Sequence, residues 1–130
     1  MELLPRELAV TIPAMYSQEA KDPSEVAVPV KYFFPAGRGT WYVVEAEAVL
    51  KDGSCRPLAE VTETDEVEDV IFFGFVRSPL GPDLDEMGNF SLREMESVKG
   101  LWGLRMERDL HWDPTTTLDK VVQRGPGYHD

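Results

Sequence analysis

The sequence predicts an α+β protein, with an antiparallel sheet of about four strands and three short helices packed around it. Three observations predict this fold class. Stretches with alternating apolar residues follow one another through compact turns. A dense apolar run, residues 70–76, is rich in β-branched and aromatic residues and is too short to cross a membrane. The segments that begin with helix-start signals are each long enough for only a short helix.

Length and cysteine content indicate one domain in a reducing compartment. The chain has 130 residues, of which 42% are hydrophobic, as is typical of one globular domain. We expect this domain to span residues 1–124 and residues 125–130 to form a loose tail. Cys55 is the only cysteine, which excludes an intrachain disulfide, and the N-terminal residues do not resemble a signal peptide. These features favour a cytoplasmic location.

The first elements are a short helix and a strand. Pro5 is a favoured first-turn residue, and Leu8 and Ile12 follow at helical spacing. Residues 26–34 alternate as a strand does, and Pro29 within them indicates an edge position or a bulge.

The next strand is predicted at residues 40–50, returning antiparallel after a Pro/Gly turn at residues 35–39. Its alternation predicts one apolar face, made by Tyr42, Val44, Ala46 and Ala48. The opposite face becomes acidic toward its end, and we expect Glu45 and Glu47 to point into solvent there.

The central strand is predicted at residues 70–76, where both faces are apolar and should therefore be covered. Gly74 suits the close approach of a neighbouring element. Prolines in residues 78–82 end this strand. Residues 55–69, which precede it, are weakly patterned, and we expect them to form a long mobile connection.

A second helix is predicted to begin at Ser91, which with Glu94 three residues later fits a capping box. Phe90 would pack against Met95 as a hydrophobic staple, and Gly100 is placed to stop the helix.

The C-terminal part is predicted to contain a last strand and a last helix. The strand covers residues 104–112. The helix begins near Asp113, and its inner face is predicted to be Leu118, Val121 and Val122.

The charge of the chain disfavours some binding functions and is compatible with others. The net charge is −11, and residues 41–90 alone carry 12 acidic and 3 basic residues, or −9. Direct nucleic-acid binding is therefore disfavoured, because it requires a basic surface. The carboxylates of this region are candidates for one acidic binding face: Glu45, Glu47, Glu60, Glu63, Asp65, Glu66, Glu68 and Asp69. The alternative is a solvated acidic surface without a partner.

The sequence contains no motif for a metal, a cofactor or a nucleophile. It has no Gly-rich phosphate loop, no Cys or His pair at metal-ligand spacing and no nucleophile elbow, so we expect no metal and no cofactor. Cys55 has no neighbouring histidine that would activate it. Arg108, between Glu107 and Asp109, can be interpreted in two ways. It either forms a structural ion pair with the helix at Ser91 or binds a ligand.

Several motifs recur in the order known from one family. They are Lys31-Tyr32-Phe33-Phe34-Pro35, Thr40-Trp41-Tyr42, Phe72-Phe73-Gly74-Phe75-Val76, Glu86-Met87-Gly88-Asn89-Phe90-Ser91-Leu92-Arg93-Glu94 and Glu107-Arg108-Asp109-Leu110. In these motifs the chain resembles a small bacterial family of unknown function found on plasmids, phages and other mobile elements. The resemblance covers roughly Leu3 to Val122. It marks as family-motif positions Glu86, Gly88, Phe90, Ser91, Glu94, Glu107, Arg108 and Asp109. It implies a cytoplasmic protein of mobile elements, often encoded near antirestriction genes, and no established activity.

Two functions are compatible with these observations. The first is a non-enzymatic binding protein whose acidic face engages a basic, DNA-binding surface of a host or defence protein. The second is a small-ligand-binding protein or enzyme with Glu94, Glu107, Arg108 and Asp109 in a cleft beside the central strand. The sequence favours the first, and it favours binding over catalysis. We expect no membrane association, and the oligomeric state stays open.

Overall fold

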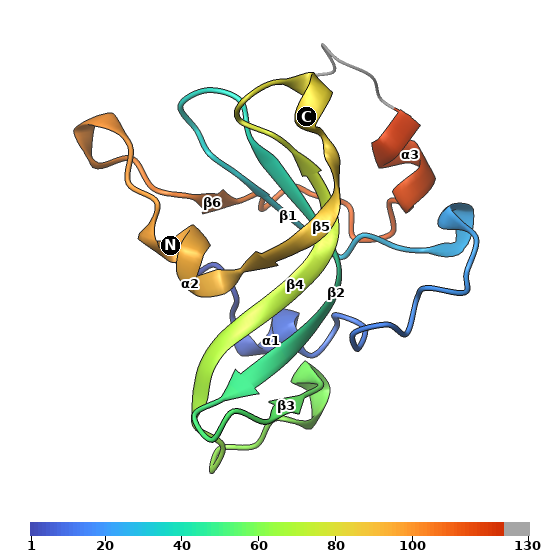
Figure 1. Cartoon of the computed structure of the whole chain (residues 1–130), viewed down its shortest axis with the longest axis vertical. Coiled ribbons are helices and arrows are strands. Elements are labelled where there is room, and N and C mark those ends of the chain that lie inside the picture. Colours follow the sequence, from blue (N-terminus) through green and yellow to red (C-terminus); the bar gives the residue numbers. More distant parts are fainter. Residues whose placement is uncertain (124–130) are drawn as a thin grey trace.

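Six strands and three short helices make up the fold in the computed structural model, which describes residues 1–123 (Figure 1). The expected tail at residues 125–130 lies outside the described residues. The helices are α1 (Arg6–Ala9), α2 (Leu92–Ser97) and α3 (Leu118–Gln123). The strands are β1 (Val30–Phe33), β2 (Thr40–Leu50), β3 (Cys55–Arg56), β4 (Val67–Arg77), β5 (Glu86–Ser91) and β6 (Glu107–Arg108).

The strands form one antiparallel sheet in the order β5-β4-β2-β1-β6, with β3 paired to β2 beside this path. The α+β class and the antiparallel sheet are confirmed, whereas the expected number of about four strands is wrong. β3 and β5 are the additional strands. None of the helices in residues 1–123 is long and apolar enough to cross a membrane.

The long strands β2 and β4 form the middle of the sheet, and their pairing contains two irregularities, of which the one between Val43 and Glu45 changes the predicted faces. Val43 pairs with Gly74 and Glu45 with Phe73, so Val44 is an extra residue on β2, as in a β-bulge. Because a one-residue shift exchanges the two faces, the predicted apolar face is wrong. Ala46 and Ala48 lie in one hydrophobic cluster, and Tyr42 and Val44 lie in another.

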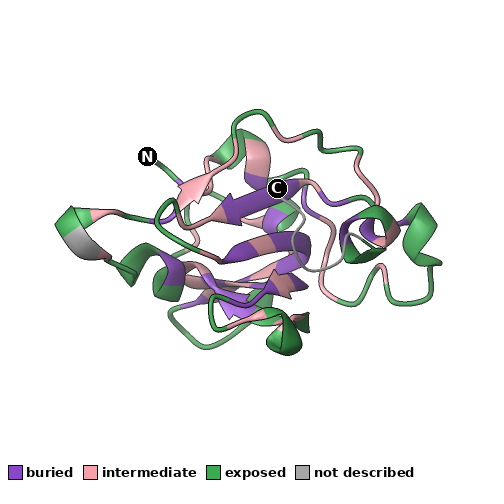
Figure 2. Cartoon of the chain, turned by 90° about the horizontal axis from the view of Figure 1, so that it is seen from above, coloured by how far each residue is buried: buried purple, intermediate pink, exposed green. Residues whose placement is uncertain are grey.

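Two hydrophobic cores cover the two sides of the sheet, and buried residues are concentrated on its strands (Figure 2). The larger core joins residues near α1, such as Ile12, to Tyr32 on β1, Phe72 on β4 and Met95 on α2. The smaller core lies under α3 and includes Val26, Val28, Tyr42, Val44, Phe75, Leu118 and Val121. On β4, Ile71 and Phe73 are only half-buried. The expectation that both faces of the central strand are covered therefore holds along only part of its length.

Residues 55–69 are not the long unstructured connection that we expected. Cys55 and Arg56 pair with the end of β2, and Leu58 is buried in the larger core. The guanidinium of Arg6 holds the following turn by donating to the carbonyl oxygens of Leu58 at 2.9 Å and Val61 at 2.8 Å. This clamp fixes α1 against the segment that leads into β4.

The helix α2 begins as predicted and ends earlier. The Ser91 hydroxyl accepts a hydrogen bond from the Glu94 N–H at 3.1 Å, which confirms the N-cap. Phe90 and Met95 are both buried in the larger core. Val98 already has an extended backbone, so Gly100 does not stop the helix.

The two C-terminal elements are shorter than predicted because aspartates form turns next to them. The Asp109 carboxylate accepts from the N–H of His111 at 2.9 Å, and β6 ends just before it, at Arg108. The Asp113 carboxylate accepts from the N–H of Thr115 at 2.9 Å, and α3 begins only at Leu118. Val122 is 47% exposed, so its predicted place on the inner face of this helix is wrong.

Candidate functional site

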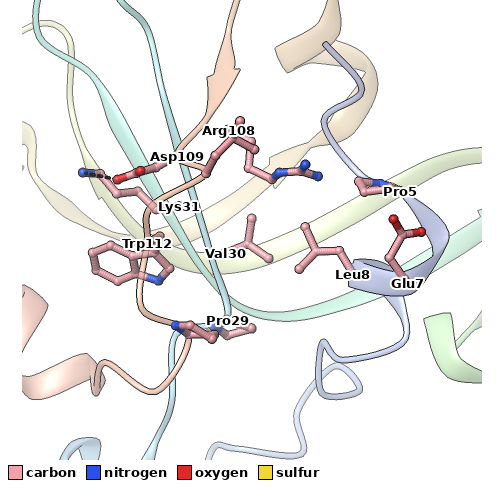
Figure 3. Close-up of a pocket in the computed structure, with 11 residues that line it drawn as sticks. Pro5, Glu7, Leu8, Pro29, Val30, Lys31, Arg108, Asp109 and Trp112 are labelled. Carbon is pink, nitrogen blue, oxygen red and sulfur yellow. Dashed lines mark ion pairs between the residues drawn. The ribbon is translucent and has the colours of Figure 1, made fainter.

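A pocket of about 300 Å³ lies between α1, β1 and the residues that follow β6 (Figure 3). It is lined mainly by apolar side chains and by four charged ones. The lining residues are Pro5, Glu7, Leu8, Pro29, Val30, Lys31, Arg108, Asp109, Leu110, Trp112 and Pro114. This mixture of an apolar surface with a few charged groups is typical of small-ligand sites.

Local sequence explains how these side chains meet. Pro5 precedes α1 as its N-cap, and the helix carries Glu7 and Leu8 to one side of the pocket. Arg108 pairs with Tyr32 across β1 and β6, which brings the end of β6 beside Val30 and Lys31. In Figure 3 the Val30 and Leu8 side chains lie between the charged groups.

Lys31 and Asp109 close one end of the pocket as an ion pair. Their charged atoms are 3.3 Å apart, and Lys31 is only 3% exposed. The Lys31 ammonium also lies 5.5 Å from the centre of the Trp112 ring, a cation–π distance. The indole N–H of Trp112 donates to the Val28 carbonyl at 2.8 Å, which fixes the ring. A buried ammonium is stable here because it is paired.

Arg108 differs from the other arginines of residues 1–123. Its Nη1 atom is buried and has no hydrogen-bond partner, and no carboxylate in this part of the chain forms an ion pair with it. The remaining described arginines each donate to a carbonyl or pair with a carboxylate: Arg6, Arg38, Arg56, Arg77, Arg93 and Arg105. A buried charged donor without an acceptor costs free energy. Arg108 is therefore the group of the pocket best placed to gain from a ligand.

Tyr32 lies behind Arg108 and is fully buried. Its hydroxyl donates to the Leu3 carbonyl at 2.7 Å. Burial raises the pKa of Tyr32 well above its ordinary value, and the positive charge of Arg108 opposes this rise only in part. Tyr32 is therefore a neutral, structural neighbour of the guanidinium.

The predicted acidic face is only partly available to a partner. Glu45, which we expected in solvent, is 2% exposed, and its carboxylate accepts from the Gln18 N–H at 2.7 Å. Glu45 directly follows the bulge at Val44, and Ala14, in the segment before Gln18, pairs with the adjacent Ala46. Glu47 is half-buried.

Several acidic side chains of residues 60–69 hold the local structure together. Asp65 accepts from the Thr62 N–H at 2.8 Å, and Asp69 accepts from the Arg93 N–H at 3.0 Å. Two further carboxylates take part in exposed ion pairs, Glu66 with Lys51 and Glu68 with Arg93. Glu60 and Glu63 are exposed.

The family-motif positions separate into structural and pocket residues. Glu86 and Gly88 belong to β5, Phe90 packs 5.4 Å from Phe72 between ring centres, and Ser91 caps α2. Glu94 is exposed on α2, and Glu107 pairs with Phe33 across β6 and β1.

Of the four residues predicted to share a cleft, only Arg108 and Asp109 line this pocket. The pocket lies at the β1–β6 edge of the sheet, whereas the predicted cleft was placed beside the central strand β4. An ion pair of Arg108 with α2, the alternative interpretation, does not occur.

Sequence reasoning missed Glu7, Lys31 and Trp112 as pocket residues. Lys31 carried a detectable signal, because it is a charged residue within an otherwise apolar strand. Glu7 and Trp112 carried none, since only the packing of α1 and of the chain after β6 brings them to β1.

The remaining candidates for chemistry in this chain are a metal site and the Cys55 thiol. Among residues 1–123, no three His, Cys, Asp or Glu side chains gather closely enough to hold a metal ion. Desolvation, followed by the charge of Glu47, raises the pKa of the exposed Cys55 thiol, which disfavours a reactive thiolate.

Comparison with known proteins gives one match. The family DUF2958, described as protein of unknown function, matches residues 51–125. A search of curated proteins found no match, and a search of solved structures found none either.

Proposed function

Since this chain belongs to the DUF2958 family of proteins of unknown function, we propose its function from its own geometry: it is a binding protein that holds a small organic anion at Arg108. The observation that carries this proposal is the guanidinium of Arg108, with a buried Nη1 atom that lacks an acceptor, at a pocket of about 300 Å³. A carboxylate is the best match, because guanidinium and carboxylate form two parallel hydrogen bonds.

The apolar part of such a ligand would lie on Val30 and Leu8, which line the pocket between its charged groups (Figure 3). Trp112 supplies an aromatic surface at one end. Its ring is held by the Val28 carbonyl and the Lys31 ammonium, so it is in place before the ligand binds. Preformed groups lose little entropy on binding.

The test is a titration with N-acetyl-L-leucine, which has one carboxylate and an apolar side chain, followed by NMR at the indole N–H of Trp112. The methyl ester of this compound lacks the charge and serves as the control ligand. Arg108→Met should weaken binding of the acid roughly ten- to hundredfold, since hydrogen bonds to charged groups contribute about 1.5–3 kcal/mol. Arg93→Met removes an exposed arginine of α2 and should leave the affinity unchanged. Equal affinities of the parent and Arg108→Met proteins would contradict the proposal.

A second candidate function is the acidic face engaging a basic surface of a host or defence protein. The exposure of Glu60, Glu63 and Glu66, in the region with net charge −9, favours it. The mobile-element setting implied by the motif resemblance supports it as well. Electrostatic steering of this kind weakens as salt rises.

Its test is capture of partners from a bacterial lysate at low and at physiological salt. A variant with Glu60, Glu63 and Glu66 changed to Gln should lose the partners, while its stability stays nearly unchanged because exposed charges contribute little. Asp65 and Asp69 are left intact, since their carboxylates accept backbone hydrogen bonds. Capture that is indifferent both to salt and to these substitutions would exclude the acidic face.

A further inference from the structure

We propose that the ligand of the Arg108 pocket is a free α-amino acid with an apolar side chain, bound through both its carboxylate and its ammonium group. This inference rests on the proposed function and adds the ligand class to it.

The first step concerns the charges that line the pocket. Lys31 and Asp109 neutralise each other across 3.3 Å. Arg108 and Glu7 are left, one positive and one negative, and neither has an ion-pair or side-chain hydrogen-bond partner among residues 1–123. Figure 3 shows the Arg108 guanidinium and the Glu7 carboxylate at the same end of the pocket, with Pro5 beside them.

The second step concerns what can bind next to both charges. A ligand with only a carboxylate would meet Arg108 favourably and Glu7 unfavourably, because like charges repel at short range. A ligand with only an ammonium group would have the reverse problem. An α-amino acid carries both groups on its Cα atom, so it can pair its carboxylate with Arg108 and its ammonium with Glu7.

The third step concerns the rest of the ligand. From the charged end, the pocket continues over Leu8 and Val30 toward Trp112 (Figure 3). An aliphatic or aromatic side chain placed there would remove apolar surface from water. The volume of about 300 Å³ is at the small end for ligand pockets, which suits a single amino acid.

The experiment compares four ligands by calorimetry and by NMR at the Trp112 indole N–H. L-Leucine has both charges and an apolar side chain, N-acetyl-L-leucine lacks the ammonium, L-leucinamide lacks the carboxylate, and glycine lacks the side chain. We expect L-leucine to bind at least tenfold more tightly than each of the other three.

Variants assign each charge to its partner. Glu7→Gln should weaken L-leucine at least tenfold and leave N-acetyl-L-leucine equal or stronger, whereas Arg108→Met should weaken both. Glu7 is exposed, so its substitution should leave the fold intact, and Glu19→Gln, another exposed acid, is the matched control.

The outcomes distinguish the inference from the proposed function. If N-acetyl-L-leucine binds through Arg108 as tightly as L-leucine, or if Glu7→Gln leaves L-leucine binding unchanged, the amino-acid inference is overturned and the anion pocket stands. If no ligand shifts the Trp112 signal of the parent protein at millimolar concentration, both are overturned.

Discussion

A side chain at Gly74 would collide with the backbone of Tyr42: a Cβ atom added there would lie 1.7 Å from the Tyr42 carbonyl oxygen. Gly74 on β4 pairs with Val43 on β2, next to the bulge at Val44. The irregular backbone of β2 therefore approaches β4 so closely that only glycine fits. This contact joins the two longest strands of the sheet.

Gly74→Ala should be strongly destabilising. We expect a loss at or above the roughly 3 kcal/mol upper end of ordinary overpacking, because the obstacle is backbone and cannot rotate away. Urea unfolding measures it. Gly88→Ala is the matched control, since Gly88 pairs with Gly74 on β5 and its Cβ would meet nothing within 4 Å. The control should be neutral or slightly stabilising. Similar losses for both variants would show that the close approach is not the cause.

Ser91→Ala should remove the N-cap of α2 and lower the free energy of unfolding by about 0.5–2 kcal/mol. The Ser91 hydroxyl accepts from the Glu94 N–H, and Ser91 is buried, so water cannot easily replace the lost acceptor. Ser97→Ala, at the exposed end of the same helix, should cost less. Coincident urea curves for Ser91→Ala and the parent protein would mean that the cap contributes nothing.

Phe72→Ala should cost roughly 3–5 kcal/mol, as is typical of a fully buried aromatic residue. Phe72 is completely buried and packs against the rings of Tyr32 and Phe90. Its neighbour Phe73 points to the other face and is only half-buried, so Phe73→Ala should cost clearly less. Urea unfolding measures both losses of stability. Equal losses for Phe72→Ala and Phe73→Ala would contradict the prediction.

Stability should fall as the pH drops below about 4. Hydrogen bonds from nearby Ser or Thr residues lower the pKa values of four aspartates from the ordinary 3.8: Asp22, Asp52, Asp65 and Asp113. Because their pKa is lower in the folded protein, they stabilise it fully above the unfolded pKa and lose this effect as the pH falls through the folded pKa.

A triple variant with Asn in place of Asp22, Asp52 and Asp113 tests this. Asn keeps the acceptor oxygen and does not titrate. The melting temperature of the variant should therefore decrease less than that of the parent between about pH 5 and about pH 2.5. Parallel curves would show that other carboxylates account for the acid sensitivity.

Sequence patterns predicted the elements whose residues have strong local preferences. The limits of β2 and the cap at Ser91 followed from alternation and from the capping box. β5 was not predicted, because Glu86, Gly88 and Asn89 have low strand propensity. It forms because β4 offers a partner along Ile71 to Val76. The strand structure of such a segment is determined by its tertiary pairing rather than by its local propensity.

The bulge at Val44 and the pocket could not be predicted from local sequence patterns, because both depend on tertiary contacts. Val43 and Val44 are both apolar, so either residue could face the larger core, and the contact between Gly74 and Tyr42 selects one arrangement. Arg108 was identified as a candidate from its charged neighbours. Its relation to Glu7 depends on where α1 packs, which no spacing in the sequence reveals.

The strand order has a consequence for the folding of the protein during its synthesis on the ribosome. β1 and β2 are neighbours in sequence and can form a hairpin early, but β2 needs β4 on its other side. Until residues 67–77 have emerged from the ribosome, at a synthesis rate of roughly 5–20 residues per second, the nascent hairpin has an unpaired apolar edge. Such an edge is a template for aggregation. Nascent chains in which residues 30–50 have emerged from the ribosome and residues 67–77 have not should therefore be the species that chaperones and proteases encounter most.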